Sequence, residues 1–287
     1  MNSIELSNGM RLPRIGLGAK GIWGGEDVLN SELAQKQYDI YKYALESKQC
    51  ELFDTSESYG YNERLLGEAI KETKSRNRVQ IISKISNRSQ KSGNVRAALE
   101  KSLKTLNTDY LDVYLIHWPQ TGCFVDTYLQ MEQLYKEGLV RAIGVCNCNI
   151  HHLNEIMYKA TIPPMINQIE VHPMFTQEAL VNFCYAMDIK VIAYSPVARM
   201  HDVLIKSRPI YELSRNYAKS PVQIILRWHY QNERIAIPQT TSREHFKEIF
   251  EIFDFELTRK EMAWINSLNE NMRMRYNPDN CDFSRLG

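Results

Sequence analysis

The sequence predicts an α/β protein, a closed (β/α)8 TIM barrel, and three observations lead to this fold class. The chain has 287 residues, of which 44% are hydrophobic, so it can bury a large core. Short apolar segments alternate with amphipathic stretches of ten or more residues, as parallel strands alternate with helices. Near the N-terminus, Asn8-Gly9 separates two short apolar runs, which predicts a β-hairpin with a type I′ turn ahead of the barrel.

The predicted strands share a short apolar run that is followed by a polar turn. In chain order they cover residues 15–18, 51–54, 79–84, 111–117, 140–145, 165–170, 190–194 and 234–238. An open doubly wound sheet is the main alternative, because Gly16, Gly18 and Gly21 have the spacing of a dinucleotide-binding loop. No acidic residue about 20 positions later stands out as a ribose ligand, so the barrel is preferred.

Helices are predicted between these strands at residues 62–73, 94–106, 127–136, 151–159, 176–187 and 221–232. The last of these begins with Ser220-Pro221, a helix cap followed by proline in the first turn. Residues 269–287 have no periodicity, but they include Met272, Tyr276 and Phe283, so we expect a C-terminal tail over one barrel mouth. No internal linker interrupts the pattern, and residues 1–287 are predicted to form one domain.

Charge and cysteine usage exclude several classes of function. Lys and Arg number 35 and Asp and Glu 34, which gives no electrostatic argument for a nucleic-acid or anionic membrane partner. No apolar run has the length of a membrane span or the form of a signal-peptide core. The six cysteines are spread thinly and are expected to be reduced thiols in a cytoplasmic protein. Cys146 and Cys148 have no second close pair of ligands, so no metal is expected.

The carboxyl ends of the predicted strands carry polar or ionisable residues. In a (β/α)8 barrel these ends form the active-site face, so residues from different strands are expected to meet at one mouth. The residues at these ends are Asp54, Lys84, His117, Asn147, Gln168 and Tyr194.

Tyr59 lies in the loop that follows Asp54 and is expected above this mouth. A buried Lys84 needs a counter-ion, and Asp54 is the natural partner. A nearby ammonium lowers the pKa of a phenol, and a histidine such as His117 can orient or relay a proton. These four residues therefore suit the protonation of a developing alkoxide.

Motifs around these residues follow one another in chain order. They are Asp-Thr-Ser-Glu-Ser-Tyr-Gly-Tyr-Asn-Glu (54–63), Ile-Ser-Lys (82–84), Ile-His-Trp-Pro (116–119), Ile-Gly-Val-Cys-Asn (143–147), Asn-Gln-Ile-Glu-Val-His-Pro (167–173), Ala-Tyr-Ser-Pro (193–196) and Ile-Pro-Gln-Thr (237–240). From the opening hairpin to residue 268 the chain resembles the aldo-keto reductase family. The resemblance implies a (β/α)8 barrel, a nicotinamide cofactor, and reduction of an aldehyde or ketone to an alcohol without metal or flavin.

The resemblance also implies roles for individual residues. Tyr59 corresponds to the general acid, Lys84 paired with Asp54 lowers its pKa, and His117 orients the carbonyl. Tyr194 is expected to stack on the nicotinamide ring. The implied cofactor-binding residues are Gly18, Asp54, Cys146, Asn147, Gln168, Tyr194, Ser195, Gln239, Thr240, His245 and Glu248.

The chain departs from the family pattern mainly at the cofactor. Cys146 replaces a serine that is a better hydrogen-bond donor. Gln239 and His245 stand where the family tends to place Lys and Arg, although Arg243 lies nearby. We therefore expect NADPH as cofactor, with a weakened preference over NADH.

Trp23 and Trp118 are the predicted walls of the substrate pocket, and the substrate is expected to be a small or polar carbonyl compound. A cofactor-binding regulatory or scaffold subunit on the same fold is the alternative function, which the intact catalytic residues disfavour. A metal-dependent hydrolase would need clustered ligands at the strand ends, where only His117 and His172 come close. The sequence does not indicate an oligomeric state.

Overall fold

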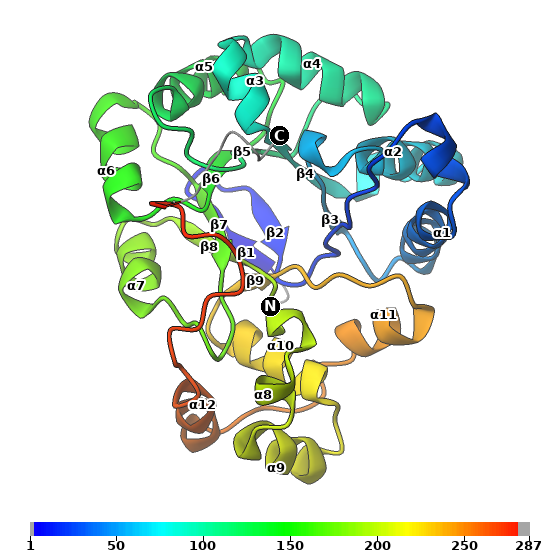
Figure 1. Ribbon diagram of the computed structural model, residues 1–287, viewed down its shortest axis with the longest axis vertical. Helices are drawn as coiled ribbons and strands as arrows, with labels where there is room; N and C mark the ends of the chain where they lie inside the picture. The colour runs from blue at the N-terminus through cyan, green and yellow to red at the C-terminus, as the bar shows by residue number, and fades with distance from the viewer. Residues whose placement is uncertain (1–2, 281–287) are drawn as a thin grey trace.

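The computed structural model describes residues 3–280 and is a closed α/β barrel with helices arranged in a ring around a parallel sheet (Figure 1). Seven strands follow one another in sheet order, each parallel to the next. They are β3 (Leu52–Asp54), β4 (Gln80–Ile85), β5 (Val113–Ile116), β6 (Ile143–Cys146), β7 (Ile166–Glu170), β8 (Lys190–Tyr194) and β9 (Ile235–Ala236). The prediction of a (β/α)8 barrel is confirmed.

The first predicted strand, residues 15–18, closes the barrel through single bridges rather than as a regular strand. Ile15 bridges to β9 and Leu17 bridges to Phe53 of β3. A Cβ atom on Gly18 would lie 2.7 Å from the carbonyl oxygen of Ile237. The backbone of residues 15–18 pairs alternately with the chain at β9 and with β3, so it forms no continuous ladder with either strand.

The predicted N-terminal hairpin is formed by β1 (Ser3–Glu5) and β2 (Arg11–Pro13), which are antiparallel. It lies at the amino ends of the barrel strands. The side chain of Asn8 donates to the carbonyl of Arg141, just before β6, and Gln80, the first residue of β4, donates to the carbonyl of Arg11. The hairpin therefore leaves the opposite mouth, at the carboxyl ends of the strands, open for a site.

The six predicted helices are present, with ends that differ from the predicted ones by at most a few residues. They are α2 (Asn62–Thr73), α4 (Val95–Thr105), α5 (Phe124–Lys136), α6 (Ile150–Lys159), α7 (Glu178–Ala186) and α10 (Pro221–Gln231). Six more were not predicted: α1 (Glu32–Ser47), α3 (Asn87–Ser92), α8 (Asp202–Ile205), α9 (Arg208–Tyr217), α11 (Arg243–Phe250) and α12 (Arg259–Asn266). Among residues 3–280, no helix combines the length and the apolar character needed to cross a bilayer.

The tail crosses the outside of the barrel from α12 and returns to the mouth, as predicted for its described part (Figure 1). The backbone N–H groups of Met274 and Arg275 donate to the carboxylate of Glu170, at the carboxyl end of β7. Tyr276 packs edge-on against Trp118, with ring centroids 6.1 Å apart. Phe283, which was also expected to close the mouth, lies outside the described residues.

Glu63 places a carboxyl group in the interior where α2 packs on the barrel. It is 4% exposed, and the hydroxyls of Ser83 and Ser102 donate to its two oxygens at 2.6 and 3.2 Å. Burial is the largest influence and raises the pKa of Glu63 to about 7, although the two serines act in the opposite direction.

This raised pKa predicts a pH-dependent loss of stability. The folded protein holds the Glu63 proton more tightly than the unfolded chain, so the contribution is complete below pH 4.5 and is lost as the pH rises through about 7. Between about pH 5 and 8, wild type should lose on the order of 3 kcal/mol relative to Glu63→Gln, which does not titrate there. Urea unfolding of both proteins across this range measures the difference. Parallel stability curves would contradict the prediction.

Candidate active site

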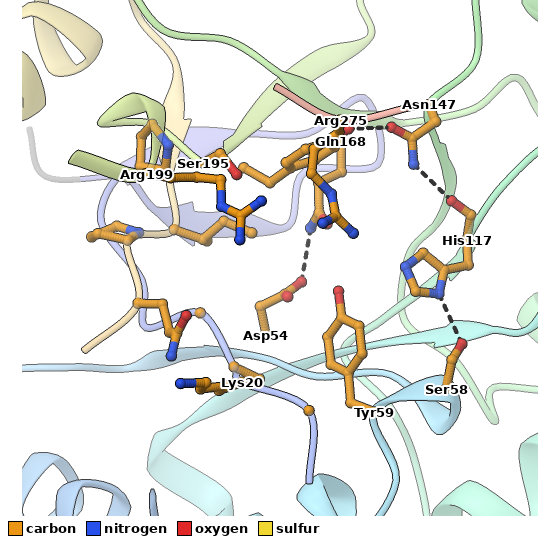
Figure 2. Close-up of a pocket in the computed structure, with 18 of the residues that line it drawn as sticks. Lys20, Asp54, Ser58, Tyr59, His117, Asn147, Gln168, Ser195, Arg199 and Arg275 are labelled. Atoms are coloured by element: carbon orange, nitrogen blue, oxygen red, sulfur yellow. Dashed lines mark hydrogen bonds between the residues drawn. The ribbon is translucent and has the colours of Figure 1, made fainter. Parts of the chain in front are cut away.

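A cavity of about 720 Å³ opens at the carboxyl ends of the strands (Figure 2). Most of the residues that the sequence nominated reach it from different strands and loops. The nominated residues in its lining are Gly18, Trp23, Asp54, Tyr59, His117, Trp118, Asn147, Gln168, Tyr194, Ser195 and Gln239. Lys84 and Cys146 lie behind this lining, and both are buried.

Lys84 and Asp54 form an ion pair at the base of the cavity. Lys84 is fully buried, and its Nζ donates to Asp54 Oδ1 at 2.7 Å and to the carbonyl of Thr55 at 2.8 Å. Gln168 donates to the same Asp54 oxygen at 2.8 Å from the other side of the barrel. Burial lowers the pKa of Lys84, but the Asp54 carboxylate and its other neighbours outweigh burial and raise it above its ordinary value. The lysine is therefore a charged ammonium.

Tyr59 lies above this pair, at the end of a single 3-10 turn (Glu57–Tyr59). Its ring centroid is 5.2 Å from Lys84 Nζ and 5.4 Å from the centre of the His117 ring. Burial raises the pKa of Tyr59, and the Lys84 ammonium lowers it by a smaller amount. The predicted effect of Lys84 is confirmed in direction, but the net pKa is raised because removal of the phenolate from water is the larger effect. The phenol keeps its proton at neutral pH.

His117 faces two serine hydroxyls that the sequence did not nominate. Its Nδ1 lies 3.0 Å from Ser58 Oγ and 3.1 Å from Ser56 Oγ. Burial lowers the pKa of His117 well below its usual range, and Lys84 and Arg275 lower it further. The imidazole is therefore neutral. A hydroxyl that donates to Nδ1 places the ring proton on Nε2.

Asn147, Gln168 and Tyr194 form the opposite side of the cavity. Asn147 donates to the carbonyl of His117 at 3.0 Å and accepts from the Tyr194 hydroxyl at 2.7 Å. Cys146 lies 1% exposed behind Gln168, and its Sγ is 3.8 Å from Gln168 Oε1. The sequence nominated Cys146 for contact with the cofactor. In the structure Cys146 contacts Gln168 and does not line the cavity.

Of the residues nominated for the far end of the cofactor, Gln239 lines the cavity, whereas Thr240, His245 and Glu248 do not. Thr240 accepts a hydrogen bond from the backbone N–H of Ser242, and His245 and Glu248 follow on α11. Arg243, a candidate substitute for a missing phosphate ligand, holds its guanidinium 5.0 Å from the centre of the Tyr43 ring. Thr240, His245 and Glu248 are therefore not brought together with Tyr59 and His117 in this cavity.

The two nominated tryptophans differ in environment. Trp118 is 5% exposed and packs against Tyr276, whereas Trp23 is 67% exposed and donates through Nε1 to the carbonyl of Ser58 at 2.8 Å. The lining also includes three cationic residues that were not among the nominated site residues, which are Lys20, Arg199 and Arg275. They come from loops and the tail, where no periodicity indicates the direction of a side chain.

Comparison with known proteins shows the family of this chain. A model of the Aldo/keto reductase family matches residues 14–270. The chain belongs to this family. It is 41% identical to the uncharacterized oxidoreductase YtbE of Bacillus subtilis (strain 168), with 97% of this chain and 96% of the relative covered. Glyoxal reductase of the same organism is 38% identical, with 98% of each chain covered.

A solved structure gives the same fold. The aldo-keto reductase AKR2E5 of the silkworm Bombyx mori, complexed with NADPH, has a TM-score of 0.85 at 27% identity, with 94% of this chain and 88% of that chain covered. As a member of the aldo/keto reductase family, this protein is an NAD(P)H-dependent carbonyl reductase. The alternative of a regulatory or scaffold subunit is disfavoured, because Tyr59, His117 and the Lys84–Asp54 pair are all present and adjacent.

The buried ion pair gives a stability prediction. Lys84→Met leaves the Asp54 carboxylate buried without its cation and should destabilise the protein by about 3–5 kcal/mol. Adding Asp54→Asn removes the orphaned charge and should recover at least half of the loss. A double-mutant cycle measured by urea unfolding reports the coupling. If the double variant is no more stable than Lys84→Met, the two residues are not coupled.

Proposed function

We propose that this protein reduces small aldehydes with NADPH and that Tyr59, His117, Lys84 and Asp54 are the residues that carry the reaction. The observation that carries the proposal is the stack of Tyr59 over the buried Lys84–Asp54 pair, with neutral His117 beside it. This arrangement offers a protonated phenol and a neutral imidazole to a single carbonyl oxygen.

The other side of the cavity fits a nicotinamide cofactor. Tyr194 offers an aromatic ring, and Asn147 and Gln168 offer amide groups that match a carboxamide. Lys20 and Arg199 supply positive charge that suits phosphate groups. When bound, NADPH supplies the hydride. The NADPH complex of the silkworm relative supports this choice of cofactor.

The residues of this chain then act on the carbonyl oxygen. Tyr59 Oη donates its proton to that oxygen as negative charge develops there, and Lys84 stabilises the phenolate that remains. His117 Nε2–H donates a hydrogen bond to the same oxygen and fixes its direction. Asp54 keeps Lys84 charged, and the Gln168 bond to Asp54 holds the pair in place.

The substrate end of the cavity favours a small carbonyl compound. Trp118 lines the cavity, and its ring packs against that of Tyr276. A relative named glyoxal reductase supports the same size class.

The reduced state expected for the cysteines agrees with the five free thiols among the described residues, and we propose a cytoplasmic location on that basis.

Recognition of the cofactor's 2′-phosphate is assigned to Gln239, Thr240 and His245, with Glu248 at the adenine. His245 is exposed on α11, where an anion can reach it. With histidine in place of a permanent cation, NADPH should be preferred over NADH by a moderate factor.

The proton donor is tested by Tyr59→Phe, which removes only a hydroxyl. Turnover of an aldehyde should fall by at least about 100-fold, while the Kd of NADPH changes little, because the ring and its packing remain. Tyr61→Phe is the matched control, since Tyr61 is in the same loop but does not line the cavity. Stopped-flow turnover and fluorescence titration measure the two quantities. A Tyr59→Phe enzyme with near wild-type turnover would disprove the assignment.

Cofactor choice is tested by His245→Arg, which places a permanent guanidinium on α11. The ratio of NADH Kd to NADPH Kd should rise by roughly 10-fold, equal to about 1.4 kcal/mol. His151→Arg adds the same charge on α6 and serves as the control. An unchanged ratio would place the 2′-phosphate away from α11.

A further inference from the structure

The cavity carries more positive charge than the reduction of a neutral carbonyl needs. Lys20, Arg199 and Arg275 all line it, whereas the acidic lining residue, Asp54, is already paired with Lys84. A cleft lined by one sign of charge attracts ligands of the opposite sign. Lys20 and Arg199 are accounted for by the phosphates of the cofactor, but Arg275 is not.

Arg275 lies on the side of the cavity where the chemistry takes place. Figure 2 shows its guanidinium pointing into the cavity, toward the side that holds Tyr59 and His117. Burial is the largest influence on the pKa values of both residues, and the charge of Arg275 lowers both. The guanidinium therefore lies within electrostatic reach of the two groups that contact the carbonyl oxygen.

The backbone beneath Arg275 is fixed to the barrel. The Glu170 carboxylate is fully buried and accepts from the N–H groups of Met274 at 2.6 Å and of Arg275 at 3.0 Å. The neighbouring Tyr276 ring packs on Trp118, and the Arg275 Cζ lies 5.7 Å from the centre of that Tyr276 ring. These contacts hold the tail at a defined position on the mouth. The backbone that carries the Arg275 side chain is therefore fixed relative to the barrel.

The guanidinium of Arg275 has N–H donors that no described carboxylate accepts. Within residues 3–280, no carboxylate forms an ion pair with Arg275, whereas Arg76, Arg96 and Arg141 each have an acidic partner. A guanidinium presents a planar fork of N–H donors whose geometry matches a carboxylate. An anion that enters the cavity can therefore take up donors that no described acidic residue uses.

We propose that Arg275 forms a substrate anion subsite, and that the preferred substrates are small aldehydes or ketones that carry a carboxylate. This inference rests on the proposed function of the cavity. The carboxylate binds the Arg275 fork, and the carbonyl oxygen then lies between Tyr59 and His117. The subsite selects among carbonyl compounds and adds no step to the reaction.

The experiment compares an acid with a neutral substrate of nearly the same shape. The kcat/KM of para-carboxybenzaldehyde and of para-formylbenzamide is measured with NADPH for wild type, Arg275→Ala and Arg275→Lys. In wild type, the kcat/KM of the acid should exceed that of the amide by at least about 10-fold. This factor is at the lower end of the free energy contributed by a hydrogen bond to a charged group. Arg275→Ala should reduce this ratio to about 2-fold or less, and Arg275→Lys should retain part of it.

Arg273→Ala is the matched control, because it removes the same charge from the same tail. Arg273 holds its guanidinium 4.5 Å from the centre of the Phe175 ring and does not line the cavity. It should leave the ratio of acid to amide unchanged. An equal loss in Arg273→Ala and Arg275→Ala would mean that the net charge of the tail acts at long range, and the subsite proposal would be wrong.

A binding measurement separates this proposal from the proposed reductase activity. Benzoate, which cannot be reduced, should bind wild type at least about 10-fold more tightly than Arg275→Ala by calorimetry. The Kd of NADPH should be the same in both proteins. Loss of NADPH affinity in Arg275→Ala would assign the residue to the cofactor and overturn the subsite.

The remaining outcomes are also decisive. Reduction of the neutral amide without preference for the acid would overturn the subsite and leave the proposed function intact. No reduction of either aldehyde would contradict the proposed function, and the benzoate titration would then decide the subsite by itself.

Discussion

The ion pair between Lys84 and Asp54 is the constraint on which the rest of the site depends. Two charges that are both at most 3% exposed are stable together only if their remaining hydrogen-bonding capacity is also satisfied. The carbonyl of Thr55 and the amide of Gln168 do this, and they connect β3, β4 and β7 across the barrel interior. The pair therefore fixes the base of the cavity, and Tyr59 lies directly above it.

Two residues at the mouth have an unusual backbone geometry. Asn147 and Ser195 follow β6 and β8 with φ of +59° and +47°, in the left-handed region. Ser195 occupies this region at a cost of roughly 1–2 kcal/mol, whereas asparagine tolerates it better than most residues. Asn147 then bonds to both the His117 carbonyl and the Tyr194 hydroxyl. These two hydrogen bonds connect the amide side of the cavity to the side that holds His117.

Much of the barrel and the inner site could be predicted from the sequence, because each strand is a short apolar run with a polar residue at its end. The parts that could not be predicted have physical reasons. Residues 15–18 bridge alternately to two neighbours, which no single-strand pattern reveals. Helix α1 was not predicted, although it has a readable pattern: Ser31 is its cap, and its buried face includes Ile40, Tyr41, Ala44 and Leu45. Arg275 is placed by the bonds from the tail backbone to Glu170, a contact between distant segments that local sequence does not encode.

The most direct test of this account is the charge of Lys84 at the base of the cavity. Selective ¹⁵N labelling of lysine side chains and ¹H–¹⁵N correlation spectra, with Lys84→Met to assign the signal, report whether Nζ is an ammonium. The account predicts an ammonium signal for Lys84 that exchanges slowly with water and does not titrate up to about pH 10, the ordinary pKa of a lysine. A neutral-amine shift, or a titration near neutral pH, would show that no buried ion pair supports Tyr59 and would contradict the account.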